Sequence, residues 1–184
     1  TITATVSTGG TIVGTAAVAA VSGVVTYSGL GLTGATGTYT LTYTVTTGST
    51  SLTALTQTIA IAAGAATKLN LSRSSDGTAS GAAFTTQPQV TLQDSGSNTV
   101  TTTGTTITAT ISSGGTLVGT ATANTVSGVA TFSNLGITGT AGTSYTITYS
   151  SGSLTTATQS ITVSVGAATQ LVLTRSSEIG RAHV

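Results

Sequence analysis

A near-duplication inside the chain constrains the fold more than any other feature. Thr1–Thr5 (TITAT) recurs as Thr106–Thr110, and Gly64–Thr67 (GAAT) recurs as Gly166–Thr169. The period of roughly 100 residues is too long for one coil of a solenoid and matches the size of a whole small domain. We therefore expect a series of domains that share one fold.

The repeat also places the joints between units, at the small-residue segments Gly64–Thr67 and Gly166–Thr169. We expect residues 1–64 to be the C-terminal part of a unit that lacks its opening strands, and residues 65–166 to be a complete unit; these are the first and second units below. Residues 167–177 would open the next unit. The first unit should expose core surface. Because the joint is short and not rich in proline, neighbouring units should sit end to end with limited freedom.

Residues 178–184 interrupt the repeat. The first copy continues from Arg73 into Ser74-Ser75-Asp76, whereas the second copy departs after Ser177. The sequence of this tail matches the translation of a common sequencing adapter, so we expect it to be non-native and leave it out of the fold prediction. The tail contains the only histidine, His183.

The composition favours an ordered β-protein. Charged residues make up 4% of the 184 positions, against about 25% in an ordinary soluble chain. Disordered chains usually combine low hydrophobicity with high net charge, whereas here the net charge is +1 and the mean hydropathy is +0.41. Val, Ile, Leu, Thr and Tyr alternate in short runs and no useful window has a helical period, so we predict an all-β fold of antiparallel strands.

About seven or eight short strands are expected in the second unit, at the spacing typical of a two-sheet sandwich. Pro88 suits the start of a strand or an edge strand. Asp94–Asn98 reads as a turn, with Gly96 free to adopt positive φ. Ala16–Ala20 and its counterpart 121–125 are interpreted as strand or strand edge. The main expected strands span residues 68–71, 90–92, 107–111, 116–120, 129–132, 145–149 and 160–163.

Substitutions between the copies predict which residues form the core. Apolar residues exchange for others of similar volume, as a packed interior tolerates. Positions that change polarity, such as Ala19 against Asn124, are predicted to lie on the surface. The core pairs are Val6/Ile111, Ile12/Leu117, Tyr27/Phe132, Leu32/Ile137 and Leu41/Ile147.

Four segments carry a family resemblance: the AATxLxL opening at 65–71, the strand and turn at 88–94, Gly128–Phe132 and Gly142–Tyr149. Together they resemble the bacterial immunoglobulin-like repeats of large surface adhesins of the invasin and intimin kind. The resemblance implies tandem immunoglobulin-like antiparallel β-sandwiches, the first one truncated. It also implies that Tyr39 and Tyr145 are tyrosine corners, buried rings whose hydroxyls bond to backbone. That role is structural.

Calcium was considered because related repeats often rigidify their joints with it. Ca²⁺ takes six to eight oxygen ligands, several of them carboxylates. Outside the tail the chain has only two acids, Asp76 and Asp94. We therefore interpret Asp94 as a turn cap and expect neither a metal nor another cofactor.

The sequence lacks the residues that several other kinds of chemistry require. The chain has no cysteine, and Lys68, the candidate for an isopeptide bond, is replaced by Gln170 in the next copy. Nucleophilic catalysis needs a base beside Ser or Thr, and a glycosidase needs a pair of acids. The few basic residues do not predict a nucleic-acid site. The longest apolar run, 59–66, is far shorter than the ~20 residues of a membrane span. We expect no catalytic residues, no nucleic-acid partner and no membrane span.

The function predicted from the sequence is mechanical. Such units would be non-catalytic spacer or stalk repeats of a large bacterial cell-surface or secreted adhesin-like protein. Their partners would be neighbouring repeats, with host or surface ligands bound by domains outside this sequence. The alternative is a carbohydrate- or ligand-binding accessory module of a secreted multidomain protein. An exposed aromatic platform would favour the alternative, but most rings fall in inward register. Glycosylation of the threonines stays open.

Overall fold

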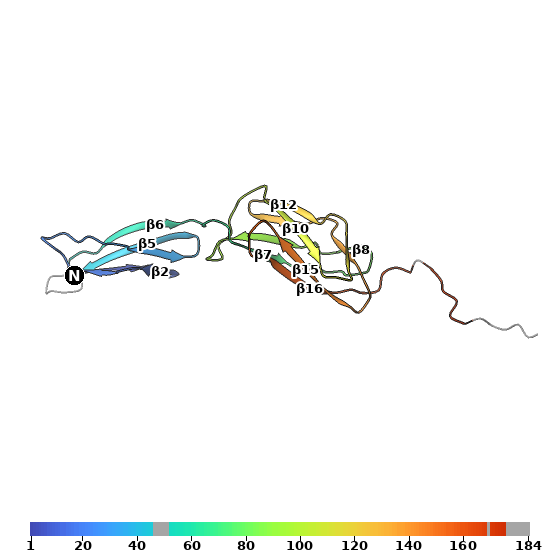
Figure 1. Ribbon diagram of the computed structural model, residues 1–184. Helices are drawn as coiled ribbons and strands as arrows, with labels where there is room; N and C mark the ends of the chain where they lie inside the picture. The colour runs from blue at the N-terminus through green and yellow to red at the C-terminus, as the bar shows by residue number, and fades with distance from the viewer. Residues whose placement is uncertain (46–51, 169, 176–184) are drawn as a thin grey trace, which may run out of the picture.

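The computed structural model describes residues 1–45, 52–168 and 170–175. These residues form β-strands and connections without a helix, and the named strands pair antiparallel. The predicted all-β, antiparallel fold class is confirmed. Strands β1–β6 lie in the first unit and β7–β16 in the second, and the two groups follow each other end to end (Figure 1). Within the described ranges, no sheet contains strands of both groups.

The second unit is built mainly from one seven-stranded sheet, in the order β16-β15-β10-β12-β13-β9-β7. A three-stranded sheet, β11-β14-β8, lies beside it. The strands are β7 (Lys68–Arg73), β8 (Ala82–Ala83), β9 (Gln89–Gln93), β10 (Thr106–Ile111), β11 (Thr116–Val118), β12 (Thr122–Val126), β13 (Val129–Thr131), β14 (Gly136–Thr138), β15 (Ser144–Ser150) and β16 (Ala157–Thr162).

The large sheet curls until its two end strands meet. The N–H of Leu69, on β7, donates to the carbonyl of Thr155 at 2.8 Å, just before β16. The N–H of Thr155 donates to the carbonyl of Thr67 at 3.0 Å. The second unit is therefore a sandwich whose main sheet is nearly closed like a barrel, and these bonds link its two edges.

The core of the second unit fills this curled sheet. Phe132 and Tyr149 pack with ring centroids 5.4 Å apart and planes at 57°. Ile137, on the small sheet, belongs to the same cluster, which shows that both sheets contribute. No buried side-chain nitrogen or oxygen of the described residues lacks a hydrogen-bond partner. The largest fully buried side chains include Tyr149, Phe132, Leu92, Ile107, Leu135 and Ile147.

The seven main predicted strands of this unit all occur, with ends shifted by a few residues. The prediction missed β8 and β14, which have 2 and 3 residues and too little alternation to be seen. Pro88 directly precedes β9, as predicted for a strand start. The edge alternative was wrong, because β9 lies between β13 and β7. The segment 121–125 largely forms β12, and Ala16–Ala20 contains the short β3.

The first unit repeats part of this plan. Its four-stranded sheet has the order β3-β1-β5-β6, and β2 pairs with β4 in a second sheet. The counterpart of β13, residues 24–26, forms no strand beyond a single bridge between Val21 and Val24. The reason is that β13 pairs with β9, which has no counterpart here. The strands are β1 (Ile2–Val6), β2 (Gly10–Val13), β3 (Ala17–Val18), β4 (Gly31–Gly34), β5 (Gly37–Val45) and β6 (Leu55–Ile61).

Candidate functional site

The loop after β9 is centred on Asp94, whose side chain is 6% exposed. Its Oδ1 accepts the backbone N–H of Asn98 at 2.8 Å, and its Oδ2 accepts the Asn98 side-chain Nδ2 at 3.1 Å. Oδ2 also accepts the N–H of Gly64 at 2.9 Å. The Gly64 N–H, followed by the Asn98 side chain, lowers the pKa of Asp94 from its ordinary value. Asp94 therefore stabilises its own turn and also bonds to the segment that connects the two units.

The backbone of this turn differs from the prediction at one position. Ser97, not Gly96, has positive φ, at 67°. Glycine at 96 has a different role, because a Cβ there would lie 3.0 Å from Nδ2 of Asn98 and 3.4 Å from Oδ1 of Asp94. The glycine thus leaves room for the two side chains that bond each other.

Asn98 extends this hydrogen bonding to the first unit. Its Oδ1 accepts the N–H of Thr36, in the β4–β5 turn, at 3.0 Å. Thr36, Asn98, Asp94 and Gly64 therefore form one chain of hydrogen bonds, the joint relay. The relay ties the second unit both to the connecting segment and to the end of the first unit. Sequence analysis identified Asp94 but missed Asn98 and Thr36, because Thr36 contributes only a backbone N–H.

The two predicted tyrosine-corner residues occupy equivalent places in the two units. Tyr39, on β5, donates its hydroxyl to the carbonyl of Ala35 at 2.9 Å. Tyr145, on β15, instead accepts the N–H of Thr140 at 3.0 Å. Both rings are buried, and both hydroxyls bond backbone just upstream of their own strands. Each hydroxyl therefore braces the backbone at one end of its unit.

Glycines pack closely against these rings. In each of the pairs Gly9-Gly10 and Gly114-Gly115, only the first glycine has positive φ. A Cβ at Gly10 or Gly115 would lie 2.9 Å from Cδ1 of Tyr39 or Tyr145, respectively. The second glycine of each pair is therefore needed for close packing under a tyrosine.

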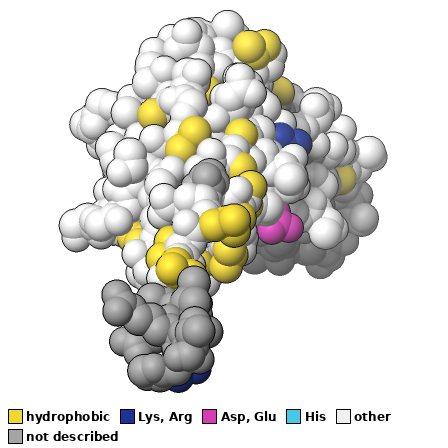
Figure 2. Space-filling model, turned by 90° about the vertical axis from the view of Figure 1, so that its right-hand side faces the viewer, with side chains coloured by type: hydrophobic (Ala, Val, Ile, Leu, Met, Phe, Trp, Pro, Cys, Tyr) yellow, Lys and Arg dark blue, Asp and Glu magenta, His cyan; other side chains and the backbone are white. Residues whose placement is uncertain are grey.

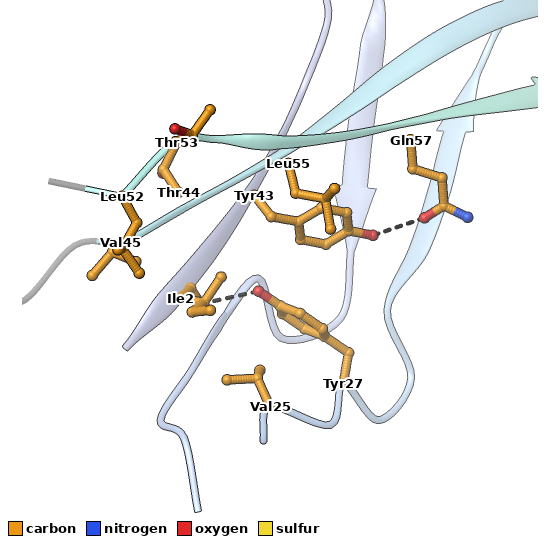
Figure 3. Close-up of a pocket in the computed structure, with 10 residues that line it drawn as sticks. All are labelled: Ile2, Val25, Tyr27, Tyr43, Thr44, Val45, Leu52, Thr53, Leu55 and Gln57. Atoms are coloured by element: carbon orange, nitrogen blue, oxygen red, sulfur yellow. Dashed lines mark hydrogen bonds between the residues drawn. The ribbon is translucent and has the colours of Figure 1, made fainter. Parts of the chain in front are cut away.

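The first unit has an open apolar hollow of about 450 Å³ between β1, β5 and β6 (Figure 3). Tyr27 and Tyr43 pack there with ring centroids 5.6 Å apart. Tyr27 donates its hydroxyl to the carbonyl of Ile2 at 3.0 Å, and Tyr43 donates to Oε1 of Gln57 at 3.0 Å. Burial, with a smaller contribution from Tyr43, raises the pKa of Tyr27. The remaining lining residues are Val25, Thr44, Val45, Leu52, Thr53 and Leu55.

Across 1–45, 52–168 and 170–175, no group of three His, Cys, Asp or Glu residues is placed to hold a metal ion. Charged side chains are sparse on the C-terminal face of the molecule, where small hydrophobic patches are scattered among polar groups (Figure 2). His183 and Glu178 lie outside the described residues.

Among the described residues, none belongs to a helix with the length and apolar character needed to cross a bilayer.

Comparisons with known proteins give only distant similarities. No family model matches the chain, and no curated protein matches it. Among solved structures, a β-glucuronidase from Parabacteroides merdae is 16% identical, with a TM-score of 0.43 over 69% of this chain and 16% of that one. A glycosyl hydrolase family 2 member from Bacteroides cellulosilyticus is 16% identical, with a TM-score of 0.45 over 67% and 17%. A β-glycosidase from Bacteroides vulgatus is 14% identical, with a TM-score of 0.44 over 77% and 20%.

The chain thus spans about a fifth or less of the length of these enzymes, over a stretch of β-structure. No inference about function rests on the likeness. The finer identification with bacterial immunoglobulin-like repeats stays a prediction from the sequence.

Proposed function

We propose that this chain is a non-catalytic part of a stalk, in which immunoglobulin-like units follow each other and hold other parts of a bacterial cell-surface or secreted protein at a distance. The observation that carries the proposal is the joint relay. It bonds Asn98 of the second unit to Thr36 of the first at 3.0 Å, and Asp94 to the connecting Gly64 at 2.9 Å. A stalk needs joints of this kind, because length in series is useful only when neighbouring units keep their relative direction.

The repeat gives the relay a way to recur along a longer chain. Thr36 and Gly64 donate through backbone N–H groups, so their counterparts Ala141 and Gly166 can donate in the same way whatever their side chains. A following unit with an Asp94-like turn would then dock on the second unit as the second docks on the first. The low charge of the chain, at 4% of residues, reduces repulsion between adjoining units.

The packing of the aromatic rings supports a spacer over a carbohydrate-binding module. Sugar-binding platforms need exposed rings, whereas Tyr39, Phe84, Phe132, Tyr145 and Tyr149 are all buried. Tyr27 and Tyr43 are partly open, but they line the hollow and do not form a flat surface.

The test is to loosen the joint without disturbing either core. We expect Asn98→Ala to widen the distribution of angles between the units, measured by small-angle X-ray scattering and residual dipolar couplings. Ser95→Ala is the matched control, because Ser95 is an exposed residue of the same turn and its side chain bonds to none of the described residues. If the wild-type units already orient as independently as those of Asn98→Ala, the stalk proposal fails. Specific binding of the chain on a glycan array would favour the accessory module instead.

A further inference from the structure

The first and last segments of the second unit lie side by side and run in the same direction. Lys68 bridges Thr155 and Ala79 bridges Ser164, both as parallel pairs. By contrast, the ladders that join β7 to β9 and β16 to β15 are antiparallel. We call the two paired segments, residues 67–80 and 155–164, the seam.

Backbone hydrogen bonds close both ends of the seam. The bonds of Thr155 described above close the end at which the chain enters the unit. At the other end, the N–H of Ser80 donates to the carbonyl of Ser164 at 3.1 Å, and the N–H of Ser164 donates to the carbonyl of Thr78 at 3.0 Å. A Cβ at Gly166 would run into the carbonyl oxygen of Ser80, which shows how closely the two backbones approach there.

Between the two ends, a side chain makes the link. The N–H and Oγ of Ser75 donate to Oε1 of Gln159 at 2.9 and 3.1 Å, and Nε2 of Gln159 donates to the carbonyl of Ser75 at 2.9 Å. The amide thus pairs with both backbone groups of one residue, as a neighbouring strand would. Oγ1 of Thr78 adds a bond to the carbonyl of Thr162 at 2.7 Å. The seam is therefore bonded at both ends and in the middle.

The chain enters and leaves the second unit at opposite ends of the seam (Figure 1). It enters just before Thr67, which bonds to Thr155, and continues after Ser164, which bonds to Ser80. Because the two segments are parallel, tension along the chain pulls one segment by its start and the other by its end. The hydrogen bonds of the seam are then loaded together, in shear, and not one after another.

We infer that the seam is the force-bearing element of the second unit, and that the amide of Gln159 completes it. Tension has to slide residues 67–80 past 155–164, which breaks the bonds at both ends and those of Gln159 in the same step. Forced unfolding is governed by the unfolding rate, so bonds broken on the way to the transition state determine the lifetime under force. The inference rests on the stalk proposal only for the tension that a stalk carries along its length.

Gln87 offers a matched comparison outside the seam. Its Nε2 donates to the carbonyls of Phe84 and Leu135 at 2.8 and 3.0 Å, and its Oε1 accepts the N–H of Leu135 at 2.9 Å. Gln87 and Gln159 are both partly buried. The two amides therefore make similar bonds to backbone in similar surroundings, but the bonds of Gln87 do not join the two segments of the seam.

The test holds the full chain at constant force in optical tweezers and measures the lifetime of the second unit. Because the chain has no native cysteine, Ala65→Cys and Ala167→Cys, both at exposed positions, attach the handles on either side of the unit. A length gain of roughly 30 nm identifies its unfolding. We expect Gln159→Met to shorten the lifetime about tenfold and Gln87→Met by less than about twofold. Both variants should lower the equilibrium stability in urea by similar amounts.

A second attachment tests the direction of the load and leaves both glutamines in place, so it decides the question even if Gln159→Met fails to fold. Ser153→Cys, at an exposed position before β16, replaces Ala167→Cys. Tension then pulls apart the end of the seam at which Thr155 bonds Thr67, and the bonds open one after another. We expect a lifetime at least about tenfold shorter at the same force.

Two outcomes would overturn the inference. One is an equal shortening of the lifetime by Gln159→Met and Gln87→Met, which would mean that any loss of stability weakens the unit under force. The other is an equal lifetime in the two pulling directions. Neither result depends on the angle between the units, so a failure here is distinct from a failure of the stalk proposal.

Discussion

The two units share most of their sequence pattern and differ in how completely their cores are covered. Phe132 and Tyr149 are 1% and 0% exposed, whereas their counterparts Tyr27 and Tyr43 border an open hollow. The aromatic pairs themselves are alike, with centroid distances of 5.4 and 5.6 Å. Local sequence therefore determines how the two aromatic rings pack against each other. The strands that cover the rings determine whether water reaches them. The difference teaches that the repeated sequence pattern specifies the same strands and the same aromatic pair in both units. Whether that pair is buried depends on the strands that pack over it.

The largest expected effect separates the two cores directly. Phe132→Ala should lower the free energy of unfolding of the second unit by about 3–5 kcal/mol, because it leaves a cavity in a closed core. Tyr27→Ala should cost the first unit only about 1 kcal/mol, near the average for point substitutions, because water already reaches this ring. Urea titration followed by amide NMR signals reports on each unit separately. Equal losses in the two units would contradict the comparison of covered and open cores.

A smaller effect is expected where a glycine packs against a buried tyrosine ring. A Cβ at Gly139 would lie 2.6 Å from Cε2 of the buried Tyr145, so Gly139→Ala should destabilise the second unit by about 1–3 kcal/mol through overpacking. Gly31→Ala serves as control, since its Cβ would meet Val13 at an ordinary 3.7 Å. Thermal unfolding followed by circular dichroism measures both. A Gly139→Ala variant as stable as wild type would show that the ring can shift.

The smallest effect concerns the joint and depends on pH. Hydrogen bonds from Gly64 and Asn98 lower the pKa of Asp94 from its ordinary 3.8, so the folded state favours the carboxylate. Its stabilising contribution is fully present above about pH 4 and is lost as pH falls through the lowered pKa. The difference in stability between wild type and Asp94→Asn should therefore shrink below about pH 4, measured by urea denaturation at a series of pH values. The difference between wild type and Ser95→Ala, which removes no ionisable group, should stay constant. A constant difference for Asp94→Asn as well would mean that the relay does not depend on the charge of Asp94.

Much of the fold could be predicted from sequence because strands leave a local signal. Alternation of Thr with Val, Ile and Tyr located strands such as β10 and β15, and substitutions between the copies identified core positions such as Leu41 and Ile147. The turn at Asp94 could also be predicted, since Asp, Ser, Gly and Asn cluster there.

The site was harder to predict because its parts act over long sequence separations. Nothing local marks Thr36 as a donor to Asn98, 62 residues away, since only its backbone N–H takes part. The role of Gly10 under Tyr39 was hidden for the same reason, because a turn glycine and a packing glycine look alike in sequence.

By itself, the sequence determined the all-β class, the repeat and some of the buried residues, such as Leu41 and Ile147, because these follow from alternation and from comparing one copy with the other. Only the tertiary structure decided that the large sheet nearly closes where β7 meets Thr155, that the first unit keeps an open hollow, and that Asn98 bonds both units. The physical reason is that pairing, burial and hydrogen bonding between distant segments depend on which surfaces meet in space. The local pattern of side chains does not specify which distant segments come into contact.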